Sequence, residues 1–461
     1  MLRFLRRKPP VPAKPVCLIE PRSAAKGVIL NGEVGAGKTT ILLELMREWA
    51  RAEERVHFAC TTVKPTDADD YERLLRKAGR DPLRITADGS FRISPFIHEL
   101  TRPGGGARNL SSLHQDLLEV ISRSDSSRTE TFWKSITEET NLYAFELAHL
   151  VRGSRARYSD VADVIMSIPQ SADEAASDSF RTSTKCGQFL ADAYAVDPKK
   201  ATVIADHFLK RLPAVGEKAR GAAVTGAMQS IQPFITPPIS NIVDGVPTHT
   251  VADLLDRDTI WAIDTHTYGK NGLAMQLILA WLCMEEVLRR KGDFDYLCLV
   301  RDEYGHTAFA ERDIRTQSTG RSQKFIGLSA IQSIPTLESQ LGGDLEAATD
   351  AKALYGLHVH KIMCRQSDQP TAEMNANIIG HERKMFFSGG SQNRPHQEPE
   401  WWDMFGVGEQ QTFGFNQQWH FRCPPITFQT LKAGGPEFDF EVEAIVYDGS
   451  DNFFRHSFFQ R

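Results

Sequence analysis

Residues 32–40 read Gly-Glu-Val-Gly-Ala-Gly-Lys-Thr-Thr and follow the apolar run Gly27–Leu30. The stretch is a complete P-loop motif, and the helical pattern Ile41–Ala50 comes directly after it. A glycine-rich loop between a strand and a helix lets successive backbone N–H groups face phosphates, and the helix N-terminus adds partial positive charge. The motif therefore predicts a nucleotide triphosphate site at one edge of a mostly parallel α/β sheet.

Within the motif, each residue type has an expected task. Lys38 should reach the β and γ phosphates, and the hydroxyl of Thr39 should ligate Mg²⁺. A glycine-rich turn between a strand and a helix is often only structural, but the full motif in this context favours the nucleotide site. The expected nucleotide-binding residues are Gly32, Glu33, Val34, Gly35, Ala36, Gly37, Lys38, Thr39 and Thr40.

The composition narrows the class of protein. The chain has 461 residues, is 41% hydrophobic and 25% charged, and so is typical of a folded globular protein. Its 7 cysteines include no CxxC pair, which supports neither a disulfide framework nor a zinc ribbon and favours a reducing cytosol. The net charge of -5 excludes a uniformly basic DNA binder, although a positive channel remains compatible with it. The apolar stretch Leu273–Met284 is shorter than the roughly 20 residues that span a bilayer, so we expect a buried helix there.

Apolar periodicity divides the chain into segments. Residues 1–25 form a basic N-terminal tail, which we expect to be either solvated or in contact with lipid or nucleic acid. Helical spacing without a strand-like run predicts an all-α domain over 110–235, inserted into a nucleotide-binding domain of residues 26–109 and 236–461. The expected strands beyond the first are Arg55–Cys60, Thr259–Asp264, Tyr296–Val300, Phe325–Ile331 and His358–Cys364, with further edge strands at Phe413–Phe421.

A second chemical site follows the strand that ends at Val300. Asp302 and Glu303 come directly after it, as in a Walker B strand, where the first carboxylate holds Mg²⁺ and the second polarises the attacking water. An Asp-Glu pair after a strand is also a routine helix cap, but the upstream P-loop favours catalysis. Arg301 directly precedes Asp302, and a buried arginine there would need a partner.

Two further polar residues belong to the next strand. Gln332 follows it and is a candidate sensor of the γ phosphate, whereas Arg321 precedes it and is a candidate arginine for stabilising transition-state charge. Either residue could instead be an ordinary surface side chain, and the sequence alone leaves both interpretations open.

Taken together, the chain resembles the type IV secretion coupling proteins, the motor ATPases of bacterial conjugation, from about Lys26 to Phe428. The order and spacing of the matching segments are more specific than any single motif. Those segments are the P-loop, Phe132–Ile136, Glu217–Thr225, Asp302–Gly305, Gly320–Ser322, Ala330–Glu338 and Arg365–Glu373.

The resemblance implies a RecA-like nucleotide domain with an all-α domain, assembled as a homo-hexamer with ATP and Mg²⁺ bound between neighbours. Arg321 would then act in trans on the next subunit's nucleotide, Gln332 would be the sensor, and Arg365 would be a second candidate for contacting phosphate across the interface. Partners would be DNA of unknown strandedness and relaxosome or secretion-channel proteins. The family's amino-terminal membrane segments are missing from this sequence, so we expect a cytoplasmic protein that reaches the inner membrane only through a partner.

The leading hypothesis is an ATP-hydrolysing hexameric motor that translocates DNA or a nucleoprotein substrate in conjugative transfer. One alternative is a soluble DNA-pumping ATPase of a mobile element or a defence system. Another is a nucleotide-switched scaffold, whose helical domain recruits a partner protein. The sequence excludes neither alternative.

Overall fold

The computed structural model describes residues 17–123, 131–391 and 411–460. Most of the predicted N-terminal tail, residues 1–16, and the side chains of Phe132 and Trp133 lie outside this description. The chain forms two compact units. Unit 1 comprises Met1–Leu30 and Lys38–His360, and unit 2 comprises Asn31–Gly37 and Lys361–Arg461.

Unit 1 is built on a sheet with the strand order β1-β6-β5-β2-β4-β3. The pairings from β6 to β3 are all parallel, and the apolar strands are buried along almost their whole length because helices cover them. This confirms the predicted α/β class. The strands are β1 (Val28–Asn31), β2 (Val56–Cys60), β3 (Leu83–Ile85), β4 (Thr259–Trp261), β5 (Tyr296–Arg301) and β6 (Phe325–Ile331).

Residues ahead of β1 already belong to unit 1. The indole of Trp49 donates a hydrogen bond to the Ile19 carbonyl at 2.7 Å, and Leu18 N donates to Glu48 at 2.8 Å. The folded part of unit 1 thus begins before Lys26, the predicted start of the nucleotide domain. The helices around the sheet are α1 (Pro21–Ala24), α2 (Lys38–Ala50), α3 (Pro65–Lys77), α4 (Pro95–Thr101), α15 (Thr265–Arg289), α16 (Ala310–Thr319), α17 (Ile334–Gln340) and α18 (Leu345–Leu357).

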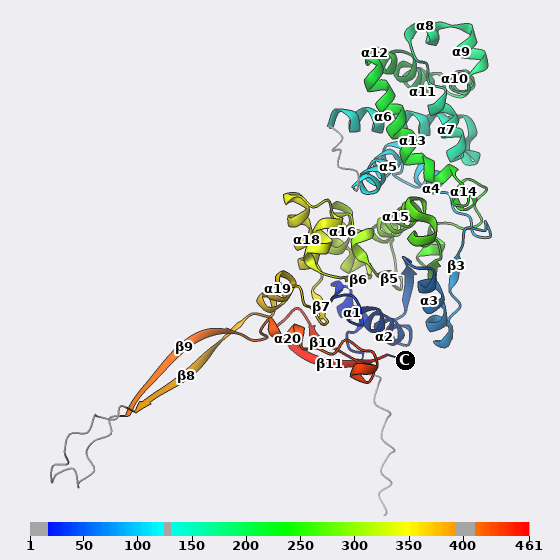
Figure 1. Ribbon diagram of the computed structural model, residues 1–461. Coiled ribbons are helices and arrows are strands. Elements are labelled where there is room, and N and C mark those ends of the chain that lie inside the picture. Colours follow the sequence, from blue (N-terminus) through cyan, green and yellow to red (C-terminus); the bar gives the residue numbers. More distant parts are fainter. Residues whose placement is uncertain (1–16, 124–130, 392–410, 461) are drawn as a thin grey trace, which may run out of the picture. The chain divides into compact units, whose positions relative to one another are not determined.

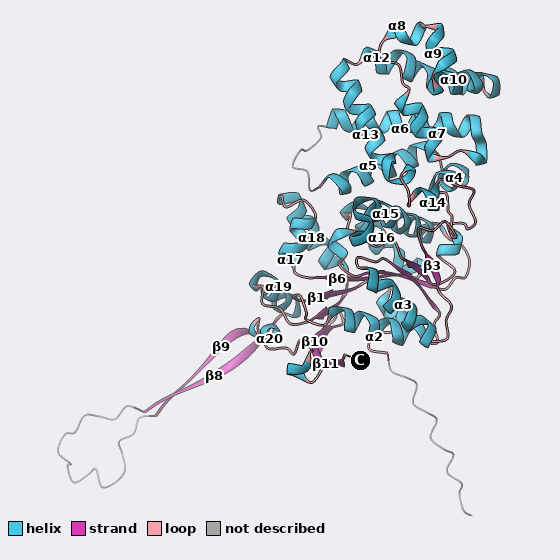
Figure 2. Cartoon of the chain, turned by 45° about the vertical axis from the view of Figure 1, so that its right-hand side comes forward, coloured by secondary structure: helices cyan, strands magenta, loops and turns pink. Residues whose placement is uncertain are grey.

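Between α4 and β4, the described residues of 107–123 and 131–235 form helices joined by turns and loops, with no strand among them (Figure 2). The central helices of this segment are α5 (Ala107–Ser122), α6 (Thr131–Arg152), α7 (Tyr158–Met166) and α13 (Glu217–Ile235). The shorter ones are α8 (Ala172–Ala176), α9 (Asp178–Ser183), α10 (Lys185–Val196), α11 (Pro198–Asp206), α12 (Leu212–Ala214) and α14 (Ser240–Val243).

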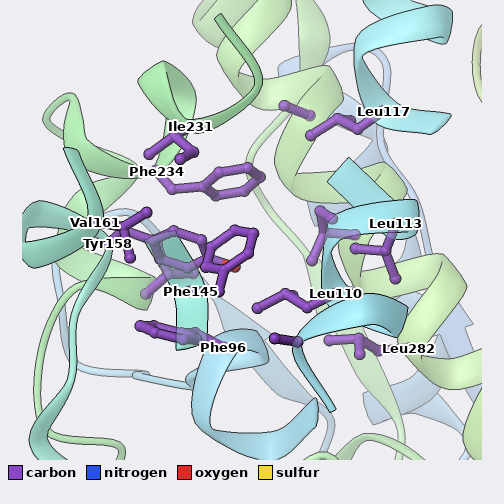
Figure 3. Packing of buried hydrophobic residues seen from close by; sticks show 14 of the residues in the cluster. Phe96, Leu110, Leu113, Leu117, Phe145, Tyr158, Val161, Ile231, Phe234 and Leu282 are labelled. Carbon is purple, nitrogen blue, oxygen red and sulfur yellow. The ribbon is translucent and has the colours of Figure 1, made fainter. Parts of the chain in front are cut away.

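The helical segment shares one apolar core with α15 of the sheet region. Figure 3 shows rings of Phe96, Phe145, Tyr158 and Phe234 packed together, with Leu282 of α15 in the same cluster. By length and composition alone, α15 could cross a membrane, the one such helix among the described residues, and 72% of its most apolar window is buried inside the protein. The predicted buried helix is therefore confirmed as a core element of unit 1.

Unit 2 combines three antiparallel strands with a hairpin. Strand β7 (His360–Met363) pairs antiparallel with β10 (Glu441–Tyr447), which pairs antiparallel with β11 (Phe453–Phe459). Helices α19 (Gln369–Ile379) and α20 (Ile426–Gln429) supply apolar residues to its core. The other pair, β8 (His381–Ser391) and β9 (Gln411–Phe421), forms a separate two-stranded antiparallel sheet, drawn in orange in Figure 1.

One sequence expectation is wrong here, and several strands were not expected. The run Phe413–Phe421 is a strand, but it pairs only with β8 and adds no edge to the main sheet. Its partner, β8, was missed because His381–Lys384 are polar or charged and give no apolar run. The sequence also missed β10 and β11, which bring antiparallel pairing to a chain otherwise rich in parallel strands.

The core of the helical segment contains a histidine that should make stability depend on pH. His114 is buried, its ring nitrogens lie 3.1 Å from the Ser230 carbonyl and 3.2 Å from the Tyr158 hydroxyl, and burial lowers its pKa to about 4. In the unfolded chain the imidazole titrates near 6.5, so between these values only the unfolded state binds the proton. The free energy of unfolding should therefore fall as the pH is lowered from about 6.5 to about 4, by up to about 3 kcal/mol from this group.

Urea unfolding at a series of pH values tests this expectation. His114→Gln should flatten the dependence, whereas His266→Gln, at an exposed histidine, should leave it unchanged. Part of the slope should persist in His114→Gln, because burial also lowers the pKa of His207 to about 4. Equal slopes in His114→Gln and the unmodified protein would contradict the assignment.

Candidate functional site

The phosphate loop, residues 32–37, lies in unit 2 and is held by its neighbours there. Gly35 and Gly37 both have φ of +80°, a conformation that side chains disfavour, which explains two of the motif's glycines. Glu33 N donates to the Arg365 carbonyl at 3.0 Å, and Ala36 is fully buried. At Gly32, an added Cβ would lie 2.7 Å from the Cβ of Cys364, so the loop backbone sits closely against the residues that follow β7.

Glu33 makes an ion pair that the sequence did not reveal. Its carboxylate accepts from the backbone N–H of Ser367 at 3.1 Å and lies 3.1 Å from Nε of Arg365. Arg365 is about one-third exposed and lies beside its own chain's phosphate loop, next to the ring of Phe438. The predicted contact of Arg365 with a neighbouring subunit's nucleotide remains a prediction, and the structure adds a partner in cis.

In unit 1, the magnesium-binding residues predicted by the motifs meet. The Thr39 hydroxyl, in the first turn of α2, donates a hydrogen bond to Oδ2 of Asp302 at 2.8 Å. Mg²⁺ is usually held in proteins by one or two carboxylates together with phosphate and water oxygens. A hydroxyl and a carboxylate at this distance fit that preference, so these two residues are suited to hold Mg²⁺.

The next pair lies on adjacent strands. Strands β5 and β6 are parallel, with Arg301 opposite Ser329, so the residues that follow each strand emerge at the same edge of the sheet. There, the amide nitrogen of Gln332 donates to Oε2 of Glu303 at 3.2 Å. Glu303 has left-handed backbone angles, φ 57° and ψ 48°, which are uncommon for a residue with a side chain.

A further carboxylate near this edge was not among the expected site residues. Asp67, in the first turn of α3, accepts hydrogen bonds from Val63 N and Lys64 N at 2.9 and 2.8 Å. Burial raises the pKa of Asp67, and the negative charge of Asp302 raises it further. A cation near Asp302 would relieve that repulsion. The only sequence signal for Asp67 was its position after the end of β2.

Two arginines are placed differently from each other. Arg301 is buried and its Nη1 lies 2.5 Å from Oδ1 of Asp313, so it has the partner that the sequence required. Arg321 is exposed and precedes β6, whereas Gln332 follows that strand. The 7 residues of β6 span about 20 Å, so Arg321 cannot reach Asp302 and Glu303 of its own chain.

Comparison with known proteins follows from this geometry. No family model and no curated protein matches the sequence. Among solved structures, the chain is similar to the trigonal form of the bacterial conjugative coupling protein TrwBdeltaN70 in complex with sulphate, with 13% identity, a TM-score of 0.61 and coverage of 96% of this chain and 89% of that chain. It is also similar to the plasmid coupling protein TrwB in complex with the GTP analogue GDPNP (14% identity, TM-score 0.60, coverage 94% and 85%) and in complex with ADP and Mg²⁺ (15%, 0.59, 94% and 85%).

These similarities show the fold. The chain has the α/β fold of the RecA-like P-loop NTPases, and the predicted class is confirmed. More particularly, it has the fold of the conjugative coupling protein TrwB over nearly its whole length. The resemblance first noted in the motifs thus extends to the three-dimensional arrangement of the chain.

Two glycines of the phosphate loop allow a matched test. An alanine at Gly37 would place its Cβ 2.5 Å from Cγ2 of Val442, whereas at Gly35 no atom lies within 4 Å. Both substitutions should lower the free energy of unfolding by about 1 to 2 kcal/mol, because alanine disfavours the positive φ. Gly37→Ala should lower it by about 1 to 3 kcal/mol more, because of the clash with Val442.

Urea unfolding of the two variants measures the difference. Adding Val442→Ala to Gly37→Ala should recover part of the loss, since it removes the colliding methyl groups. Equal stability of Gly35→Ala and Gly37→Ala would show that the loop is not packed against Val442 as described.

Proposed function

We propose that this protein is an ATP-hydrolysing hexameric motor of the type IV coupling protein class, which binds and translocates DNA or a nucleoprotein substrate in conjugative transfer. The observation that carries the proposal is the cluster at the carboxyl ends of β5 and β6, where Asp302 meets Thr39 of the P-loop and Glu303 meets Gln332. A cluster of a metal-holding carboxylate, a second carboxylate and an amide is what nucleotide hydrolysis requires.

Each residue of the site has a defined task in this proposal. Lys38 and the N–H groups of residues 32–37 bind the phosphates, and Thr39 and Asp302 hold Mg²⁺. The metal ion, when bound, neutralises charge on the β and γ phosphate oxygens. Glu303 orients the attacking water and accepts its proton, while Gln332 holds the Glu303 carboxylate and senses the γ phosphate.

The position of Arg321 supports assembly into a ring. Arg321 is exposed and lies at the opposite end of β6 from its own chain's carboxylates. An arginine in this place can stabilise transition-state charge only on another subunit's nucleotide. DNA as the moved polymer is supported by the fold shared with TrwB, whose structures are described as those of a conjugative coupling protein.

The central test of the mechanism is Glu303→Gln. The amide keeps the size of the side chain and can still contact Gln332, but it cannot accept a proton from water. We expect ATP turnover to fall by a factor of about 10² to 10⁴, with Mg²⁺-dependent binding of a fluorescent ATP analogue within about threefold of the unmodified protein. Lys38→Ala, by contrast, should lose analogue binding. Glu303→Gln with full turnover would refute the assignment.

Assembly and substrate are tested by turnover as a function of protein concentration, with single-stranded DNA, double-stranded DNA or no DNA. A ring motor should show cooperative, DNA-stimulated turnover, and Arg321→Ala should lower it by a factor of about 10³ or more. Mixing Arg321→Ala with Glu303→Gln should restore part of the activity, because a mixed ring contains sites with both residues intact.

The same measurements separate the alternatives. Turnover that is indifferent to DNA and survives Arg321→Ala would favour a nucleotide-switched scaffold. DNA-stimulated turnover by a protein that binds no relaxosome or channel component in a reconstituted assay would favour a soluble DNA-pumping ATPase.

A further inference from the structure

A buried ion pair lies directly behind the carboxylate turn Asp302-Glu303. Arg301, the last residue of β5, and Asp313, in α16, are 3% and 4% exposed, and their charged atoms are 2.5 Å apart. The other Asp313 oxygen accepts a hydrogen bond from Phe309 N at 2.8 Å. Both charges are therefore compensated inside the protein, one residue away from Asp302.

On the other side of the turn, Tyr304 contacts Arg301 of this pair. Its ring is fully buried and lies 4.3 Å from the Arg301 guanidinium carbon, a cation–π contact. Burial raises the pKa of Tyr304 well above its usual value, and the nearby charge of Asp313 raises it further. The carboxylate turn is thus a two-residue span between two anchors, Arg301 and Tyr304, whose side chains contact each other.

The turn itself is strained in a way that needs such anchors. Glu303 has a left-handed backbone, a conformation that costs of order 1–3 kcal/mol and persists only when its surroundings hold it. Its backbone hydrogen bonds are local: Glu303 N donates to Oδ1 of Asp302 at 3.1 Å, and its carbonyl accepts from His306 N at 3.1 Å. These backbone bonds do not tie the turn to the rest of unit 1. Its ties are the side-chain bonds with Thr39 and Gln332 and the two buried flanking residues, Arg301 and Tyr304.

Helix α16, which carries Asp313, is fixed in turn by the neighbouring residue. The Nε of Arg312 donates to Asp116 of α5 at 2.8 Å. Its Nη1 donates to Glu285 of α15 at 3.2 Å. The anchor for the turn is therefore connected through α16 to the helical segment as well as to the sheet.

We propose that Arg301 and Asp313 are positioning residues, which hold Asp302 and Glu303 in the geometry needed for hydrolysis. The inference rests on the proposed function and deepens it, because it assigns a task to an arginine that the sequence could not explain. The contrasting interpretation is that the pair serves stability alone. Physical chemistry separates the two, because an uncharged pair of similar size can recover the stability of a buried ion pair without restoring its geometry.

The test compares Arg301→Met and the double variant Arg301→Met/Asp313→Asn, in which Asn still accepts from Phe309 N. The single variant should lower the melting temperature, since it leaves a buried charge alone. The double variant should recover most of the lost melting temperature. Its kcat should nevertheless stay about a hundredfold below that of the unmodified protein, with KM for ATP within about threefold of the unmodified value. Recovery of kcat together with the melting temperature would overturn the proposal.

The chain offers a matched control pair. Arg80 and Asp258 lie 3.1 Å apart and are 15% and 6% exposed, and Asp258 likewise accepts from a backbone donor, Phe58 N, at 3.0 Å. Asp258 precedes β4, so this pair lies at the amino end of the parallel strands, away from the carboxylates. Arg80→Met/Asp258→Asn should keep kcat within about twofold. A loss of kcat equal to that of the Arg301 double variant would overturn the proposal.

Amide hydrogen exchange of the nucleotide-free protein separates failure of this inference from failure of the proposed function. The amides of His306 and Thr307, which donate within the turn, should exchange at least about tenfold faster in Arg301→Met/Asp313→Asn and not in the control double variant. Unchanged exchange would overturn the positioning role even if ATP is hydrolysed. Faster exchange in a protein that never turns over ATP would support the positioning role and refute only the proposed function.

Discussion

The parallel pairing of β5 with β6 is the constraint on which the candidate site depends. Its register sets Arg301, the last residue of β5, opposite Ser329, two residues before the end of β6, so both strands release their polar residues at one edge. A slip of one residue would turn the side chains at the strand ends to the opposite face of the sheet. Buried apolar residues along both strands fix the register, and so the packing of the sheet decides where Glu303 and Gln332 meet.

The helical segment and the sheet of unit 1 are joined by packing rather than by a linker. Helix α15 contributes to the same apolar core as α5 and α13, and every residue from Ala274 to Met284 is buried. The hydrogen bond from Arg312 of α16 to Asp116 of α5 also connects the sheet region to the helical segment. A structural change in the helical segment can therefore reach the carboxylate turn through α16 and the Arg301–Asp313 ion pair.

Several buried or partly buried charges in this protein are arranged so that each has a partner on another element. Arg301 meets Asp313, Arg80 meets Asp258, and Glu33 of the phosphate loop meets Arg365. Removing two charges from water is costly, so such pairs add little net stability, but an unpaired member would cost much more. Their consequence is geometric: each pair fixes the distance between two segments of the chain.

Local sequence patterns determined much of this protein. The P-loop, the buried helix around Leu273–Met284 and the strand Phe325–Ile331 were predictable, because glycine spacing and apolar runs report local backbone and burial. Strand β8 was not, since its polar residues carry no such signal, and Asp67 had no signal beyond its position after the end of β2. The partner of Arg301, the pairing of Glu33 with Arg365 and the strained backbone at Glu303 were decided by tertiary structure, because contact between side chains depends on which strands and helices become neighbours.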